Sequence, residues 1–190
     1  MKDDQGTMWF GTYYGGLDYY NPHTDIFEYN NLKLGHAGIG PVISKIIEDK
    51  TGRLWISTEG DGLVSYLPAT NDYAYYTKEN HTISHNNVKT LYYDGTSNTI
   101  WVGTHLGGLC SYSIDQKKFR HFTIDPTDHT KRSEIVQAVI RHKNILYLGT
   151  LSGVYYMNLE DYSIKKIHSL DKYISVSYTH LRAHETLRHL

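Results

Sequence analysis

The sequence predicts an all-β fold built from four tandem copies of one structural unit. Trp9, Trp55 and Trp101 are spaced 46 residues apart, and one further step of 46 reaches Tyr147. The neighbours of each aromatic also repeat, as MWFGT, LWIST, IWVGT and LYLGT. Glycine and β-branched or aromatic residues dominate these copies, and no 3.6-residue period holds, which excludes a helical repeat of similar length.

Each unit divides into four short strands separated by turn-forming residues. The second copy predicts strands at 42–48, 53–58, 62–67 and 72–77, and the third predicts strands at 88–93, 99–104, 109–114 and 118–123. Four-stranded repeats of roughly 40 to 50 residues are the blades of β-propellers. The predicted fold class is therefore an all-β propeller fragment of four blades of four-stranded antiparallel sheets, an open arc of a larger propeller. Its first blade lacks the innermost strand.

The repeated residues have a structural explanation in this fold. Each large aromatic should fill the space between neighbouring blades, and a small residue two positions later should let a backbone approach closely. The structural repeat positions are Trp9, Trp55, Trp101, Tyr147, Gly11, Gly103 and Gly149. We expect the four aromatics to be mostly buried in equivalent surroundings. A residue with positive φ is expected three positions before each aromatic, and the residues there are Gly6, Gly52, Asn98 and Asn144.

The propeller arc is expected to span 1–173, in units of about 1–36, 37–82, 83–130 and 131–173. Residues 174–190 contain none of the repeat formula and are expected to lie outside the native fold. A strand at 173–178 that paired beside 7–12 would instead close the ring. His180 and His184 have the i, i+4 spacing of metal ligands on a helix, but no third ligand is placed with them. No metal site or cofactor is therefore predicted.

Composition excludes several classes of function. The net charge of −1 gives no electrostatic footprint for nucleic acid. The single cysteine, Cys110, cannot form an internal disulfide and is expected to be a small buried residue. No apolar run approaches the roughly 18 residues of a membrane helix. The sequence thus leaves open a cytoplasmic chain or a piece of a protein whose export signal lies elsewhere.

The repeat resembles a known family. The pattern D-x-x-G-x-[LIM]-W-[IVF]-[GS]-T-x-x-x-G-L, present at Asp3–Leu17 and Asp49–Leu63, is similar to the two-component regulator propeller repeat. So is the link Ile83–Val88 between blades. The resemblance implies the periplasmic sensor region of a hybrid two-component system of the Bacteroidota type, which detects glycan breakdown products. It further implies a membrane-linked histidine kinase on the full-length chain, the remaining blades, and a homodimeric receptor.

One face of the arc is the candidate binding site. In a four-stranded blade, the turn between the second and third strands and the link to the next blade open on the same face, which we call the loop face. The residues there that could bind a ligand are Tyr13, Tyr14, Glu59, Asp61, His85 and His105. Aromatic platforms, carboxylates and imidazoles suit an oligosaccharide, because sugar rings stack on aromatics and their hydroxyls hydrogen-bond to polar groups.

Three classes of function remain open. The first is a ligand-sensing propeller with no catalytic site of its own. The second is a structural or dimerisation module without a ligand, and the third is a propeller enzyme that acts on polysaccharide. Glu59 and Asp61 could be a glycosidase pair, but two carboxylates on one hairpin tip have no obvious division into acid and base.

Overall fold

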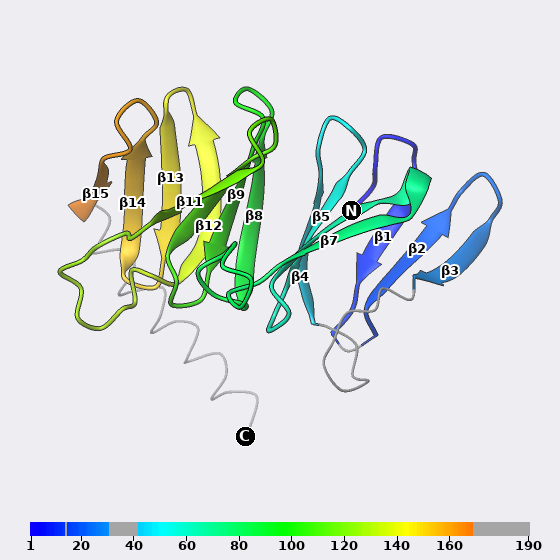
Figure 1. The fold of residues 1–190 in the computed structure, drawn as a ribbon, viewed down its shortest axis with the longest axis horizontal. Helices are drawn as coiled ribbons and strands as arrows, with labels where there is room; N and C mark the ends of the chain where they lie inside the picture. The colour runs from blue at the N-terminus through cyan, green and yellow to red at the C-terminus, as the bar shows by residue number, and fades with distance from the viewer. Residues whose placement is uncertain (14, 31–41, 169–190) are drawn as a thin grey trace, which may run out of the picture.

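The computed structural model describes residues 1–13, 15–30 and 42–168, and these fold into four antiparallel sheets that stand side by side (Figure 1). In these ranges the fold is all-β, as predicted, apart from one short 3₁₀ turn, η1 (Pro68–Thr70). Within the described ranges, no helix has the length and apolar character needed to cross a membrane. The expected tail at 174–190 and its possible pairing with 7–12 lie outside the described residues.

Among the described residues, the first sheet has three strands and the other three sheets have four, as the sequence predicted. Its strands are β1 (Met8–Gly11), β2 (Leu17–Asn21) and β3 (Ile26–Asn30). The second sheet contains β4 (Ile43–Glu48), β5 (Leu54–Thr58), β6 (Leu63–Leu67) and β7 (Asp72–Tyr76). The third contains β8 (Val88–Asp94), β9 (Thr99–Thr104), β10 (Leu109–Ser113) and β11 (Lys118–Phe122). The fourth contains β12 (Val136–His142), β13 (Ile145–Thr150), β14 (Gly153–Asn158) and β15 (Ile164–Lys166).

Each complete sheet is a meander in which sequential strands pair antiparallel. The first strand of each has a register irregularity at the same place, between Ile43 and Lys45, Val88 and Thr90, and Val136 and Ala138. An extra residue at this point bends a strand and increases its twist. The three complete copies therefore share the same irregularity of backbone geometry, at the start of their first strands and beside the loop face.

Three apolar clusters fill the spaces between neighbouring sheets, and each is centred on one tryptophan. Trp9 packs with Leu54, Ile56 and Val64 of the next sheet. Trp55 packs in the same way with residues of the third sheet, and Trp101 with residues of the fourth. The core of the arc is thus a series of interfaces between sheets, since each sheet buries its faces against its neighbours.

The fourth aromatic differs from the other three. Trp9, Trp55 and Trp101 are 3%, 1% and 3% exposed. Tyr147 is only half-buried, although the repeat led us to expect burial equivalent to the tryptophans. The physical reason is that the described residues place no fifth sheet against this face of β13. Ile140 of the adjacent strand is 62% exposed for the same reason.

The turn between the first and second strands is held by an aspartate that also binds the tryptophan. Asp49 Oδ1 accepts hydrogen bonds from the N–H groups of Thr51 and Arg53, and Asp49 Oδ2 accepts one from Trp55 Nε1 at 2.8 Å. Asp3 Oδ2 accepts the same bond from Trp9 Nε1 at 2.7 Å. The aspartate of the repeat therefore satisfies a buried indole donor that would otherwise have no partner.

Positive φ occurs at the expected turn position in three copies, Gly6, Gly52 and Asn98. In the fourth copy it falls on Lys143 instead of the expected Asn144. This hairpin is shorter, because β12 and β13 pair directly from His142 to Ile145, so the left-handed residue moves one position towards the N-terminus.

Candidate functional site

Hydroxyl groups of the repeated threonines close the hairpins on the loop face. Thr58 Oγ1 donates to the Gly62 carbonyl oxygen at 2.8 Å, and Thr104 Oγ1 donates to that of Gly108 at 3.0 Å. Thr12 makes the corresponding bond in the first sheet, and Thr150 in the fourth. The threonine therefore fixes the shape of each tip, while the residues after it are free to differ between copies.

The link between the second and third sheets joins two neighbouring hairpin tips. The Asn86 carbonyl oxygen accepts hydrogen bonds from the N–H groups of Gly60 and Gly62 at 3.2 and 2.8 Å. The next carbonyl, of Asn87, accepts from the N–H of His105 at 2.9 Å. Backbone bonds thus hold the tip of β5–β6, the link and the tip of β9–β10 together as one continuous surface.

Glu59 contributes to this surface through an ion pair. Its Oε1 lies 2.7 Å from Nζ of Lys89, which belongs to the inner strand of the next sheet. The Glu59 side chain is 34% exposed and that of Lys89 is 20% exposed, so the pair is partly shielded from water. This contact ties the second sheet to the third and leaves Glu59 partly accessible.

The two histidines predicted for the site meet across the link. The rings of His85 and His105 lie 5.9 Å apart, centroid to centroid, and are nearly perpendicular. Burial lowers the pKa of His85, and the neighbouring His105 and Lys78 lower it further, so the neutral imidazole is favoured. Beside them, two buried side-chain atoms, Asn87 Oδ1 and His105 Nδ1, have no hydrogen-bond partner among residues 1–13, 15–30 and 42–168.

The other predicted site residues are placed less closely. Asp61 lies at the tip of β5–β6, where its N–H donates to Thr58 Oγ1 at 3.1 Å. Tyr13 lies on the hairpin of the first sheet, one blade away from Glu59, and is 66% exposed. Tyr14 lies outside the described residues. The structure therefore brings together Glu59, His85 and His105 around one link, with Asp61 beside them.

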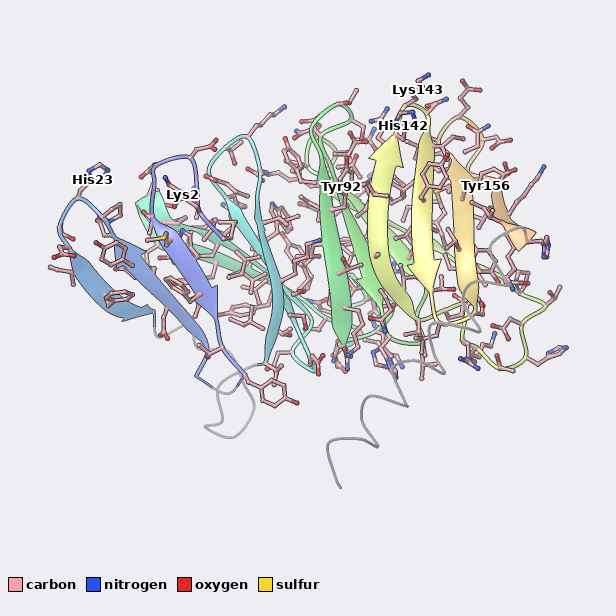
Figure 2. The ribbon with its side chains drawn as sticks, turned by 180° about the vertical axis from the view of Figure 1, so that it is seen from behind. Lys2, His23, Tyr92, His142, Lys143 and Tyr156 are labelled. Carbon is pink, nitrogen blue, oxygen red and sulfur yellow. The ribbon has the colours of Figure 1, made fainter. Side chains whose placement is uncertain are left out.

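The opposite edge of the arc carries turns to which the sequence assigned no binding residue. Figure 2 shows His142 and Lys143 at the tip of the β12–β13 hairpin, on the same edge as His23 in the turn between β2 and β3. Between the third and fourth sheets a cavity of about 470 Å³ is lined by residues of these turns, among them Ser97, Gln116 and Tyr162. Its signal in the sequence was a one-residue insertion before Trp101, which moves Asp94 to seven positions ahead of that tryptophan.

A free thiol and a cluster of metal-binding side chains are two further kinds of reactive group. Cys110 is fully buried, with its Sγ 3.1 Å from Ser84 Oγ, and desolvation raises the pKa of its thiol. A thiol in that state is a packing residue rather than a nucleophile. Among residues 1–13, 15–30 and 42–168, no three His, Cys, Asp or Glu side chains are grouped so that they could hold a metal ion.

Comparison with known proteins gives one family and a set of similar folds. The family model described as two component regulator propeller matches residues 38–60. No curated protein sequence matches the chain. The part matched by the family model covers the beginning of the second copy of the repeat, including Asp49 and Trp55.

Two similar solved structures are extracellular domains from B. thetaiotaomicron. The extracellular domain of the hybrid two component system BT3049 is 21% identical with a TM-score of 0.68, covering 85% of this chain and 22% of that one. That of the hybrid two component system BT4673 is 18% identical with a TM-score of 0.71, covering 90% of this chain and 23% of that one. The computationally designed Ika8 protein is 14% identical, with a TM-score of 0.63 over 88% of this chain and 47% of that one.

The chain spans less than a quarter of the length of the two extracellular domains that it resembles. At these identities the likeness establishes the fold. Residues 38–60 match the model of the two-component regulator propeller family, within a chain that has the fold of these extracellular domains.

Proposed function

We propose that this chain is part of the extracytoplasmic sensor propeller of a two-component system and that its loop face binds an oligosaccharide. The full-length protein would be anchored in the inner membrane and would pass the signal to a histidine kinase, as a homodimer. The observation that carries the proposal is the joining of two hairpin tips by the link at Asn86 and Asn87, which builds one polar surface from two sheets.

The composition of this surface fits a hydroxylated ligand. Asn87 Oδ1 can accept a hydrogen bond, and His105 Nδ1 can accept or donate one according to the tautomer, yet neither atom has a partner among the described residues. A sugar hydroxyl both donates and accepts, so a ligand hydroxyl could satisfy either of these buried atoms. Satisfying a buried polar atom is worth about 1–3 kcal/mol, because leaving it unpaired carries that penalty.

Variation between the copies supports the same assignment. The positions that repeat in every unit are explained by packing or by hairpin closure, whereas the two positions after each threonine differ in all four units. A scaffold needs the same residue at equivalent positions, while recognition of an asymmetric ligand needs different ones. The ion pair with Lys89 fixes the carboxylate of Glu59, which favours a binding role over that of a catalytic acid.

A structural role is the second candidate, and one observation favours it. The Glu59–Lys89 ion pair and the Asn86 carbonyl bonds all connect the second sheet to the third. On this view the loop face holds blades in register and binds nothing. The two candidates differ in what truncation of an exposed side chain does to ligand affinity.

Calorimetric titration of the intact propeller with a panel of oligosaccharides tests the proposal. His105→Ala should weaken binding of the responding oligosaccharide by about tenfold, since it removes a group worth about 1–2 kcal/mol. Tyr14→Ala and Glu59→Ala should also change the response, while thermal unfolding stays close to that of the parent protein.

Lys143→Ala is the matched control, because this exposed residue lies on the opposite edge of the arc (Figure 2). Its affinity for the oligosaccharide should equal that of the parent protein. Unchanged affinity in the Tyr14, Glu59 and His105 variants would remove the binding site from this face and would leave the structural role.

A further inference from the structure

The cavity between the third and fourth sheets is a polar cleft on the edge opposite to the loop face. Its floor is formed by two rows of paired residues on β9, β10 and β11. Trp101, Ser111 and Arg120 form one row, and Thr99, Ser113 and Lys118 form the other. The fourth sheet covers this floor with Arg141, Asn144 and Tyr162. The cleft is therefore lined by hydroxyls, amides and cationic groups, with a volume of about 470 Å³.

The corresponding space is occupied at the other two interfaces between sheets. Ten residues after the first tryptophan stands Tyr19, whose ring packs 4.9 Å from that of Trp9, and the cavity beside them measures only about 180 Å³. At the second interface the guanidinium of Arg53, two residues before Trp55, occupies this space and bonds to Ser65 Oγ and Asp72. The third interface has Thr99 two residues before its tryptophan and Ser111 ten residues after it, and these small side chains leave the cleft open.

The third interface also lacks the carboxylate that binds the indole of the tryptophan. Asp94, the aspartate of this copy, is turned towards the fourth sheet, where Arg141 Nη1 lies 2.6 and 2.5 Å from its two oxygens. Trp101 is 3% exposed, and its Nε1 has no hydrogen-bond partner in the part of the chain that the structure describes. Asp3 and Asp49 supply that partner to Trp9 and Trp55. Trp101 thus keeps a buried donor at the wall of an open cleft.

The charges around the cleft are predominantly positive. Of the described residues that line it, only Asp94 is acidic, and Arg141 already neutralises that carboxylate. Arg120 and Lys118 remain, and the Arg120 guanidinium lies over the ring of Tyr162, with its Cζ 4.6 Å from the centroid. A negatively charged ligand would therefore be attracted to the cleft, while a cation would be repelled.

We propose that this cleft is a second ligand site, separate from the loop face, which binds a small hydroxylated carboxylate. One carboxylate oxygen accepts from Trp101 Nε1, in the place that aspartate takes at the other interfaces. Arg120 and Lys118 balance the negative charge, and the hydroxyls of Ser111 and Ser113 bind those of the ligand. The volume of the cleft suits a molecule of this kind, since small-molecule sites measure about 300–1,000 Å³.

Nuclear magnetic resonance of the indole N–H groups tests the proposal, because the chain has three tryptophans and so gives three such signals. Gluconate is the probe, and sorbitol is its neutral counterpart, with a hydroxymethyl group in place of the carboxylate. We expect gluconate to move the Trp101 signal saturably, with those of Trp9 and Trp55 unchanged and no response to sorbitol. The Trp101→Phe variant assigns the signal.

Two substitutions locate the binding. Ser111→Tyr copies the residue of the first interface and should abolish the response by filling the cleft. Arg120→Gln should weaken it by about fivefold, as expected for the loss of one partly screened charge. Lys50→Gln, which removes an exposed charge from a turn of the second sheet, should leave it unchanged. The Trp9 and Trp55 signals report folding in each variant, and Arg120→Gln carries the test if Ser111→Tyr disturbs the fold.

Absence of any Trp101 shift with gluconate would overturn the proposal. An equal shift with sorbitol, or with inorganic sulfate at the same ionic strength, would overturn the assignment to a carboxylate. A response that survives both Ser111→Tyr and Arg120→Gln would place the site elsewhere. None of these outcomes depends on the loop face, so this proposal and the oligosaccharide proposal can fail separately.

Discussion

Asp49→Ala measures how much the link between aspartate and tryptophan stabilises the repeat. Asp49 is 2% exposed and Trp55 is 1% exposed, so truncation leaves a buried indole donor that water cannot reach. An unpaired buried donor costs about 1–3 kcal/mol. Loss of the bond from the Thr51 N–H adds about 0.5–1 kcal/mol, because this turn is partly solvated. The variant should therefore lose about 1.5–4 kcal/mol of unfolding free energy.

Equilibrium urea unfolding, followed by circular dichroism, gives this free energy. Combining Asp49→Ala with Trp55→Phe should show a coupling of about 1–3 kcal/mol, because both changes remove the same bond. Asp94→Ala combined with Trp101→Phe is the matched control, and its coupling should be near zero, since the two side chains are not bonded to each other. Equal couplings in the two cycles would show that the bond from Trp55 Nε1 to Asp49 does not stabilise the repeat.

Three further outcomes follow from the packing and electrostatics of the arc. In urea unfolding, Trp55→Ala should lower the free energy of unfolding by about 3–5 kcal/mol and Tyr147→Ala by about 1–2 kcal/mol, because only the tryptophan is enclosed by two sheets. Similar losses in the two variants would contradict this explanation. Gly103→Ala should cost about 1–3 kcal/mol, since the added Cβ would lie 2.9 Å from the Val136 carbonyl oxygen. Gly149→Ala should cost less, because its nearest neighbour is a methyl group at 3.3 Å, and the reverse order of unfolding midpoints would count against the model of close approach. The pKa of His85 is lowered in the folded state, so the unfolded chain takes up this proton at a higher pH than the folded chain does. The free energy of unfolding should therefore fall as pH drops below about 6.5, and His85→Gln should reduce the slope of this dependence. An unchanged slope would contradict the assignment of this proton to His85.

The strands could be predicted from the sequence because the repeat marks both ends of each one. The expected strand at 99–104 coincides with β9, and the others in the second and third sheets differ by one residue at an end. Tryptophan, threonine and glycine recur at fixed intervals, so each copy confirms the alignment of the next. The missing innermost strand of the first sheet followed from the same alignment.

Features that depend on side-chain direction, on the covering of a sheet face or on the length of a turn could not be predicted. The role of Asp49 as the acceptor for Trp55 Nε1 requires the directions of two side chains, although the aspartate itself was visible in the repeat. The half-burial of Tyr147 depends on what covers its face, which a repeat pattern does not specify. The move of positive φ from Asn144 to Lys143 depends on the length of one turn.

The candidate site was predicted in part. The loop face follows from strand order, and the sequence assigned His85 and His105 to it from different segments of the chain. Their contact across the link and the unpaired atoms beside them required the structure. The cleft on the opposite edge was missed, because it results from small residues at 99 and 111 that appear unremarkable in one copy and differ only when the three interfaces are compared.

Hydrogen–deuterium exchange of the intact sensor propeller, with and without the oligosaccharide that binds in calorimetry, tests whether the loop face is the binding site. We expect slower exchange on binding in the amides of 59–62, 84–87 and 105–108, which the link joins into one surface. The turns at 50–52 and 142–144 on the opposite edge should exchange at the same rate in both states. Protection confined to those turns, or no protection at 59–62, 84–87 and 105–108, would contradict the assignment of the loop face as the oligosaccharide site.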